Sequence, residues 1–345
     1  MKRGVLAIGV SVVLGAAASW QLHGTDRVQA AAPPQWTAPL TPWGDPDLQG
    51  IWDSKTITPM QRPETFAGRE YLTDAEVAEL ETEAARHPGE AARAEAAAEA
   101  IARGVAPYVE DVVGSCLLAF TYPGEKVVAT KRTSLIVDPP DGRIPYLEKP
   151  TSASAPSPPS QTVVPAHVPT DASGPTDNPE DRPDIERCLG VSLPCLGGLC
   201  PLSRIVQSPG FVTIYYEQGS GGGAYRTIPL DNRPHIPAHI RQWLGHSVGR
   251  WEGASLVVDT ANFSHQTSFR GSRENLHLVE RLTRVGPDQL SYRVTVEDST
   301  TFSRPWTLEL TPRKANERQN RIWETPCHEG NYSMTTSLAG ARALE

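Results

Sequence analysis

The sequence predicts an all-β protein, an antiparallel meander that closes into a barrel, with a small helical insertion near the N-terminus. Apolar and polar residues alternate through most of the chain after Ser203, which is the pattern of strands with one buried face. Short turns containing Gly, Pro or Asp separate these segments, and short strands at close spacing are typical of sandwiches and barrels. The strand candidates are residues 204–217, 225–231, 249–263, 276–285, 289–298, 304–312 and 321–326. One short helical interruption is expected at 237–245, opened by Pro237 and closed by Gly245.

Residues 1–30 have the layout of a secretory signal peptide. Lys2 and Arg3 precede an apolar run that begins at Val5, and small residues suited to cleavage lie around Ala30. The run is shorter than the roughly 20 residues that a membrane-spanning helix needs. We therefore expect a periplasmic or secreted protein whose mature part, residues 31–345, is a single barrel-like domain without a membrane span.

Removal of this segment makes the chain more acidic. The segment carries three basic residues and one acidic residue, so its loss changes the formal net charge from -8 to -10. Nucleic-acid binding depends on clustered Lys and Arg that contact phosphates. The charge therefore argues against a nucleic-acid partner, while an anionic small ligand stays open.

The helical insertion is expected at residues 73–104. Thr73 and Glu76 form a capping-box pattern at its start, and Pro88 with the following glycine divides it into two helices. A first strand at 48–54 precedes it.

Two further segments separate this insertion from the alternating region. Residues 133–147 predict a strand, a turn rich in Pro, Asp and Gly, and a short return strand. Residues 149–184 are rich in Pro, Ser, Thr and Asp, a composition that cannot bury enough apolar surface to become ordered. We expect them to form a disordered insertion on the surface of the same domain.

Several blocks of the sequence carry a resemblance. They are GDPDLQGIWDS, KRTSLIVDPPDGRIP, RIVQSPGFV, IRQWLGHSVGRWEGASLVVDTANF, ENLHLVERLTRV and CHEGNYSM. Together they cover most of the mature chain and resemble a large group of exported bacterial proteins of uncharacterised activity, so the resemblance implies export and no particular reaction. More loosely, Gly50-Ile51-Trp52 on a first strand, followed by a meander, resembles the lipocalin-like barrels.

A glutamate among leucines, Glu280, is the most informative candidate site residue. A three-residue loop at 286–288 places Leu276, Leu278 and Leu282 on the same face as Tyr292, Val294 and Val296, whereas a two-residue loop mixes the faces. In the favoured register, Glu280 lies opposite Val294 on the apolar face. A buried carboxylate must be paired, protonated or solvated by a cavity.

Three interpretations of Glu280 stay open. It pairs with a buried arginine, for which Arg250, Arg270 and Arg304 are the candidates. It lines a ligand cavity, where a raised pKa makes it a general acid or base. A bulge turns it outward.

The same register places His277 opposite Glu297 on the polar face, within cross-strand reach. This is either a solvated surface pair or a catalytic dyad. A second candidate cluster is CHEGNY, in which His328, Glu329 and Tyr332 follow a strand and line a barrel mouth or a loop pinned by a disulfide.

The strand aromatics Trp52, Tyr216, Trp251 and Trp306 either line a ligand pocket or form ordinary core. No metal site is expected. Although His235 and His239 are four residues apart, the proline between them prevents the helix that would bring both to one face.

The five cysteines predict disulfides rather than a metal site in an exported protein. Cys195 and Cys200 can close a tight loop, and Cys188 and Cys327 can tie the β region to the C-terminal segment. The odd number leaves at least one of them unpaired.

The function best supported by the sequence is binding of a small, largely apolar or amphipathic molecule. The first alternative is a cofactor-independent acid/base enzyme of the isomerase, hydratase or lyase class, with Glu280 as the base and His328 or His277 as its partner. A structural envelope protein is the second alternative.

Overall fold

In the computed structural model, the described part of the chain begins at Trp36. The described residues are 36–86, 124–147, 187–189, 192–195, 200, 202–217, 224–267, 269–316, 318, 322 and 332–344. The signal peptide, the helical segment after Arg86 and the insertion at 149–184 therefore lie outside the described residues, as does most of the strand predicted at 321–326.

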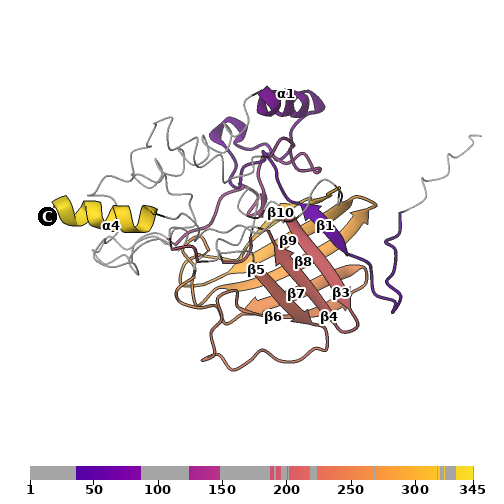
Figure 1. Ribbon diagram of the computed structural model, residues 1–345. Coiled ribbons are helices and arrows are strands. Elements are labelled where there is room, and N and C mark those ends of the chain that lie inside the picture. Colours follow the sequence, from indigo (N-terminus) through magenta and orange to yellow (C-terminus); the bar gives the residue numbers. More distant parts are fainter. Residues whose placement is uncertain are drawn as a thin grey trace, which may run out of the picture. The chain divides into compact units, whose positions relative to one another are not determined.

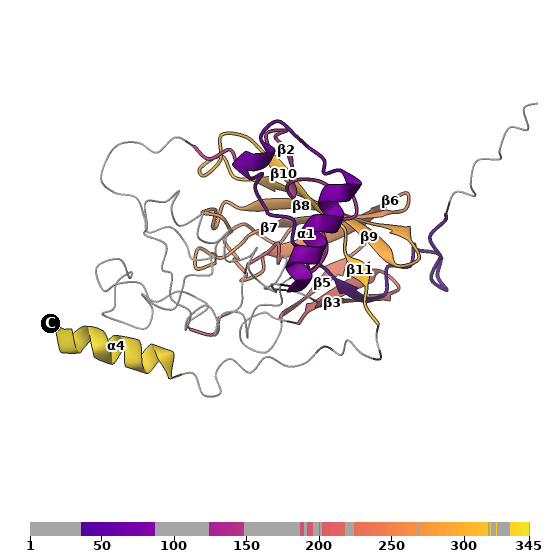
Figure 2. The same ribbon diagram turned by 90° about the horizontal axis from the view of Figure 1, so that it is seen from above.

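The fold is mostly antiparallel sheet that forms a nearly closed barrel, which confirms the predicted fold class (Figures 1 and 2). The strands are β1 (Gly50–Asp53), β2 (Ile136–Asp138), β3 (Leu202–Ser208), β4 (Phe211–Tyr216), β5 (Ala224–Pro229), β6 (His246–Glu252), β7 (Ser255–Ala261), β8 (His277–Gly286), β9 (Gln289–Glu297), β10 (Trp306–Leu310) and β11 (Arg313–Lys314). They follow the order β5-β4-β3-β1-β11-β9-β8-β7-β6, and β10 joins β9 to β2. Consecutive strands from β3 to β5 and from β6 to β9 pair as hairpins, as a meander requires.

The described helices are few. A short 3-10 helix spans Glu64–Phe66, α1 spans Asp74–Arg86 and α4 spans Ser333–Leu344. At the start of α1, the backbone N–H of Thr73 donates to Glu76 Oε2 at 2.8 Å, and the N–H of Glu76 donates to Thr73 Oγ1 at 3.3 Å, so the capping box forms.

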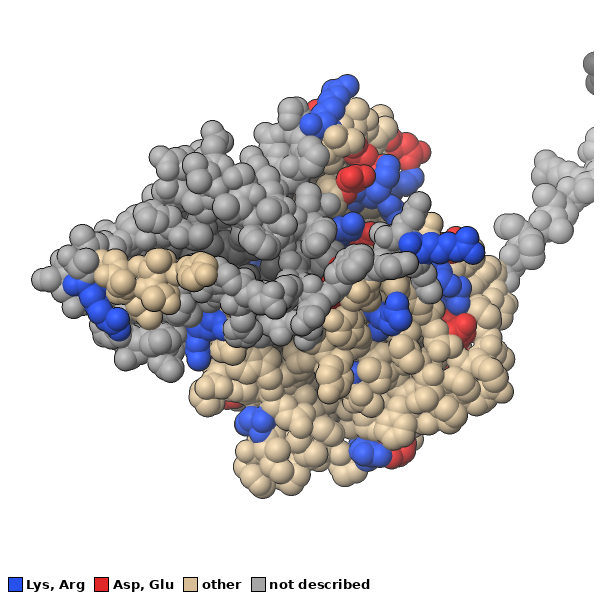
Figure 3. Space-filling view, viewed as in Figure 1, with Lys and Arg blue, Asp and Glu red and all other residues tan. Residues whose placement is uncertain are grey.

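The helix α1 buries none of its residues, and it contacts the rest of the unit through charged side chains. Lys126 pairs with Glu81 at 2.8 Å, and Lys131 pairs with Asp74. Figure 3 shows Lys and Arg next to Asp and Glu around this helix. None of the described helices is both long and apolar enough to cross a membrane.

The helix predicted at 237–245 does not form. Instead, Gln242 makes a parallel bridge with Phe263, in which the N–H of Gln242 donates to Asn262 O at 2.9 Å and the N–H of Ser264 donates to Gln242 O at 2.8 Å. A helix of nine residues is too short to be stable by itself, and these tertiary hydrogen bonds satisfy the backbone groups instead. The segment is therefore an irregular cover, residues 230–245, between β5 and β6.

The barrel closes at the seam between β5 and β6, the two ends of the strand order. Gly249 on β6 permits the close approach. A Cβ at this position would lie 2.7 Å from Cγ2 of Ile228 and 2.8 Å from Cδ2 of Leu230. The side chains of Ile228 on β5 and of Leu230 just after it thus occupy the space that any larger residue at 249 would need.

The register of the β8–β9 hairpin is the predicted one. His277 lies opposite Glu297, Glu280 opposite Val294 and Leu282 opposite Tyr292. The register shifts by one residue between Arg284 and Gly286, which places the irregularity at the turn. The inward residues of β8 and β9 join the apolar core of the barrel.

The Cys195–Cys200 disulfide is present, as predicted. Cys188 is also disulfide-bonded. Its predicted partner, Cys327, lies outside the described residues, so that bridge stays a prediction.

Candidate functional site

Glu280 is fully buried and forms a bidentate ion pair with Arg226 on β5. The guanidinium Nη1 donates to Oε2 at 2.5 Å and Nη2 donates to Oε1 at 2.6 Å. The side chains are 5% and 0% exposed. Of the three interpretations of this carboxylate, the structure shows the ion pair.

The donors proposed from the sequence were wrong. Arg250 pairs with Glu252 at 2.6 Å and Arg304 pairs with Asp138 at 2.6 Å, both with half-exposed guanidinium groups. Alternation places Arg250 on the outward side of β6, because its neighbours Gly249 and Trp251 contact the barrel core. Arg270, the third candidate, follows β7 in a loop with φ 51°.

Hydroxyl groups from four strands complete the hydrogen bonding of this ion pair. Tyr292 OH donates to Glu280 Oε1 at 2.5 Å, and Thr260 Oγ1 lies 3.5 Å from Oε2. Arg226 Nε donates to Tyr216 OH at 3.1 Å, and Nη1 donates to Ser247 Oγ at 3.3 Å. Burial raises the pKa of Tyr216 to about 12 and that of Tyr292 well above its ordinary value, so both phenols stay protonated.

The network links the two strands that the sheet leaves unpaired. Arg226 belongs to β5, Ser247 belongs to β6 and Glu280 belongs to β8, so the hydrogen bonds cross the seam. Both carboxylate oxygens are engaged by strong donors, which leaves Glu280 no free position from which to accept a substrate proton. Its role in this arrangement is to hold the barrel closed.

The aromatic residues proposed as pocket lining have different environments. Tyr216 belongs to the seam network. Trp52 and Trp306 are fully buried in the core, Trp52 Nε1 donates to Leu48 O at 2.8 Å, and Trp306 packs against Phe269 and Phe302. Trp251 is only partly buried and packs against the core from β6.

Buried donors without an acceptor mark one end of the barrel. Within the described part of the chain, Trp251 Nε1 and Arg284 Nε are buried and have no hydrogen-bond partner. Trp251 on β6 pairs with Leu256 on β7, and Leu256 pairs with Leu282 on β8. Arg284 is the next inward position on β8 after Leu282. The two donors therefore face the interior toward the same end.

Arg284 is a cation held among aromatic rings at this end. Its guanidinium lies 5.8 Å from the ring centres of both Trp36 and Trp52, donates to Asp47 O at 3.0 Å and donates to Pro287 O at 2.7 Å. Among the described residues, the nearest carboxylate oxygen is Asp47 Oδ2, 3.9 Å away. Trp306 Nε1 also lacks a partner among the described residues. Trp306 pairs with Val296, which pairs with Leu278, so this indole lies toward the opposite end of the barrel from Arg284.

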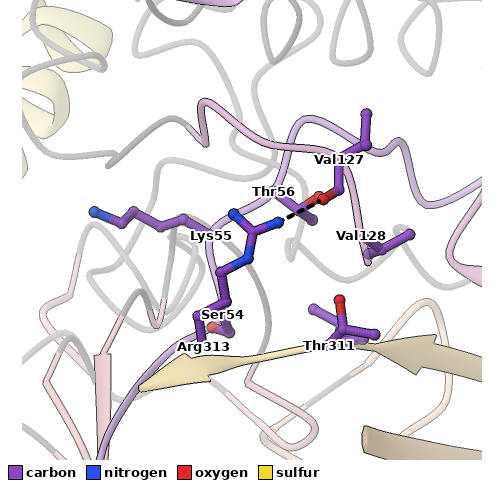
Figure 4. Close-up of a pocket in the computed structure, with 8 residues that line it drawn as sticks. Ser54, Lys55, Thr56, Val127, Val128, Thr311 and Arg313 are labelled. Atoms are coloured by element: carbon purple, nitrogen blue, oxygen red, sulfur yellow. Dashed lines mark hydrogen bonds between the residues drawn. The ribbon is translucent and has the colours of Figure 1, made fainter. Parts of the chain in front are cut away.

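A shallow pocket lies where β1 leaves the barrel, near the turn between β10 and β11 (Figure 4). It encloses about 220 Å³, part of it open solvent, and none of the predicted site residues lines it. The lining residues are Ser54, Lys55, Thr56, Val127, Val128, Leu310, Thr311 and Arg313. Arg313 Nη2 donates to Val127 O at 3.3 Å and Lys55 pairs with Asp53 at 3.3 Å, so both cations already have partners.

A histidine and carboxylate cluster covers the outer face of β6 to β9. His277 Nδ1 lies 3.0 Å from Glu297 Oε2, as the predicted register requires, and its Nε2 lies 3.0 Å from Asp259 Oδ1. The same Asp259 oxygen lies 2.8 Å from His235 Nε2, and His235 Nδ1 lies 2.9 Å from His246 Nδ1. We call these five residues the relay.

The relay residues come from four adjacent strands and the irregular cover. His246, Asp259, His277 and Glu297 belong to β6, β7, β8 and β9 in turn. His235 is held in the cover, where Asn262 Nδ2 donates to the carbonyl oxygen of the next residue, Ile236, at 2.8 Å.

The pKa shifts in the relay follow from these contacts. Hydrogen bonding to Asp259, and secondly to Glu297, raises the pKa of His277 to about 9 against the opposing effect of burial. The same bond from His277 lowers the pKa of Asp259, with a smaller contribution from His235. Burial, then the charges of His235 and Arg233, lower the pKa of His246. At neutral pH, His277 is therefore a cation between two carboxylates and His246 is neutral.

The hydrogen bonds also constrain the protons of the other two histidines. Asp259 is ionised, so His235 donates its Nε2–H to it. The 2.9 Å contact between the two Nδ1 atoms requires one proton, which either ring can hold. His246 Nε2 has no hydrogen-bond partner among the residues that the structure describes.

Three other predicted site residues do not belong to these clusters. His328 and Glu329 lie outside the described part of the chain. Tyr332 precedes α4 and is 76% exposed.

Sequence reasoning missed Arg226 and Asp259. The alternation of 225–231 could have shown Arg226 facing the core, whereas nothing in the sequence pairs Asp259 with both His235 and His277.

Comparisons with known proteins add little to this geometry. No protein-family model matches the chain, and no curated protein matches it. Among solved structures, a crystal structure of a mutant of the fluorescent protein UnaG matches with 16% sequence identity and a TM-score of 0.22. The match covers 34% of this chain and 72% of that chain. The identity and the TM-score are both low, so this likeness indicates neither a ligand nor an activity for this chain.

Proposed function

We propose that this protein is an exported β-barrel that binds a small amphipathic molecule, mostly apolar and carrying a hydrogen-bond acceptor. The observation that carries the proposal is the pair of buried donors, Trp251 Nε1 and Arg284 Nε, which face one end of the barrel without partners in the described chain. Buried polar groups in native proteins are nearly always hydrogen-bonded, so donors of this kind indicate a missing acceptor.

The surroundings of these donors define the chemistry of the ligand. Arg284 is a buried cation whose nearest carboxylate oxygen in the described part of the chain is 3.9 Å away, and the rings of Trp36 and Trp52 flank it. A carboxylate or a similar anionic acceptor suits the cation, and an apolar chain suits the indole rings and the core leucines beyond them.

Export rests on the first 30 residues and on the resemblance to exported bacterial proteins, which we retain as part of the proposal. The Cys195–Cys200 disulfide supports it, because disulfides persist in oxidising compartments.

Calorimetric titration with decanoate and with the uncharged 1-decanol tests the proposal. We expect decanoate to bind and 1-decanol to bind more weakly, since only decanoate places a charge beside Arg284. Trp251→Phe removes one donor and keeps an aromatic ring, so the dissociation constant for decanoate should rise about tenfold, equivalent to one hydrogen bond of about 1.4 kcal/mol.

Trp43→Phe is the matched control. Trp43 is 37% exposed and its Nε1 donates to Asp45, so this variant should bind decanoate as the wild type does. Equal affinity of the wild type and Trp251→Phe for decanoate, or no binding of either probe, would contradict the proposal.

A further inference from the structure

The relay ends at a nitrogen that can accept a proton. We infer that the outer face of β6 to β9 is a second functional site, separate from the barrel interior, in which His246 Nε2 acts as a general base toward a small carbonyl compound such as an ester. The inference rests on the continuous hydrogen bonds from Asp259 through His235 to His246.

The first link is the position of Asp259. This carboxylate lies on β7 between two histidines, and one oxygen accepts from both His235 Nε2 at 2.8 Å and His277 Nε2 at 3.0 Å. It is 31% exposed, so solvent screens it only in part. A carboxylate in this position orients His235 and stabilises positive charge on its ring.

The second link is the contact between the imidazoles. The rings of His235 and His246 meet edge to face, with centroids 5.2 Å apart and an interplanar angle of 74°. In the proposed site, His246 Nδ1 holds the proton of this contact and donates it to His235 Nδ1, 2.9 Å away.

The proposed reaction is hydrolysis of the ester by one water molecule. A water molecule gives one proton to His246 Nε2 while its oxygen attacks the carbonyl carbon of the ester. The proton on His246 Nδ1 moves to His235 Nδ1, and the resulting imidazolium is held by Asp259. Collapse of the tetrahedral intermediate breaks the bond to the alcohol oxygen, and the proton returns through the same atoms to that oxygen, so that the carboxylic acid and the alcohol are released.

Charged neighbours fit this chemistry. The charge of Arg233 contributes to lowering the pKa of His246, after burial and the charge of His235. It is itself held by Asp231, with Nη2 2.5 Å from Oδ2. His277, in contrast, is protonated at neutral pH and cannot accept a proton, so it serves as a positioning residue for Asp259 rather than as the catalytic partner expected from the sequence.

The test is cleavage of p-nitrophenyl acetate by the mature chain at pH 7, compared with His246→Gln and with the control His265→Gln. His265 is an exposed histidine outside the relay. General bases contribute about 100-fold or more to rates. We expect His246→Gln to lower the protein-dependent rate at least about tenfold and His265→Gln to leave it unchanged. Equal rates for the wild type and His246→Gln, or equal losses in both variants, would overturn the inference.

A second measurement needs no variant. Nitrogen-15 NMR of histidine-labelled wild-type protein at pH 7 should show a bare Nε2 and a protonated Nδ1 on His246, and both nitrogens protonated on His277. A proton on His246 Nε2 would overturn the inference even if the ester is cleaved. Because decanoate binding is read out at Trp251, this site and the proposed ligand site can fail independently.

Discussion

Replacement of Glu280 by glutamine tests whether the seam network holds the barrel closed. The change is nearly isosteric, but it leaves the guanidinium of Arg226 in a site where its side chain is 5% exposed. Burial alone lowers the pKa of Arg226, and the charge of Glu280 more than restores it, which shows how far the cation depends on this partner. Removing one partner of a buried ion pair lowers the free energy of unfolding by about 3–5 kcal/mol.

This cost is large for a domain whose total stability is about 5–15 kcal/mol. Urea denaturation followed by near-ultraviolet circular dichroism should show the midpoint of Glu280→Gln well below that of the wild type. Glu252→Gln is the matched control, since Glu252 is 39% exposed and pairs with Arg250 and Arg281 on the surface. Exposed pairs contribute about 0–1 kcal/mol, so this variant should unfold near the wild-type midpoint.

The double variant Arg226→Met with Glu280→Leu separates the charge from the packing. Apolar replacement of both partners of a buried pair is often neutral or stabilising, so the double variant should be more stable than Glu280→Gln. A loss of less than about 1 kcal/mol in Glu280→Gln, or a double variant less stable than the single one, would refute the reasoning.

Two further predictions concern the relay and the seam. The folded pKa of His277, about 9, lies above its ordinary value of 6.5, so its contribution to the free energy of unfolding is fully present below pH 6.5 and is lost as the pH rises through 9. Asp259 and Glu297 face this ring, and His277→Asn should therefore flatten the pH dependence of the unfolding midpoint between those values; an unchanged slope would contradict the assignment. Gly249→Ala should cost about 1–3 kcal/mol, because its Cβ would lie 2.7 Å from Ile228 and 2.8 Å from Leu230. Gly286→Ala is its control, with only an ordinary 3.7 Å contact to Gln289, and equal thermal midpoints for the two variants would show that the seam is looser than described.

The sequence predicted the fold class and the environment of Glu280 because both depend on patterns within short or adjacent segments. Alternation in two adjacent segments determines the register of the β8–β9 hairpin, so Glu280 opposite Val294 and His277 opposite Glu297 followed from short-range pattern alone. The partner Arg226 did not follow, since β5 meets β8 only across the interior of a closed barrel.

The relay was beyond prediction for the same reason. Asp259 reaches His277 through the β7–β8 register, which the intervening loop leaves undetermined in the sequence. His235 lies in an irregular segment where a short helix had been predicted nearby, and only the hydrogen bonds of Gln242 and Asn262 with neighbouring backbone show how that segment folds over the strands.

Native mass spectrometry of the mature protein purified from its own envelope tests the central claim most directly. We predict a small anionic molecule that stays bound under gentle ionisation and is released on mild denaturation. Trp251→Phe, purified in the same way, should carry less of it than Trp43→Phe. Wild-type protein that is consistently empty, or variants that carry equal amounts, would contradict a ligand site at the Arg284 end of the barrel.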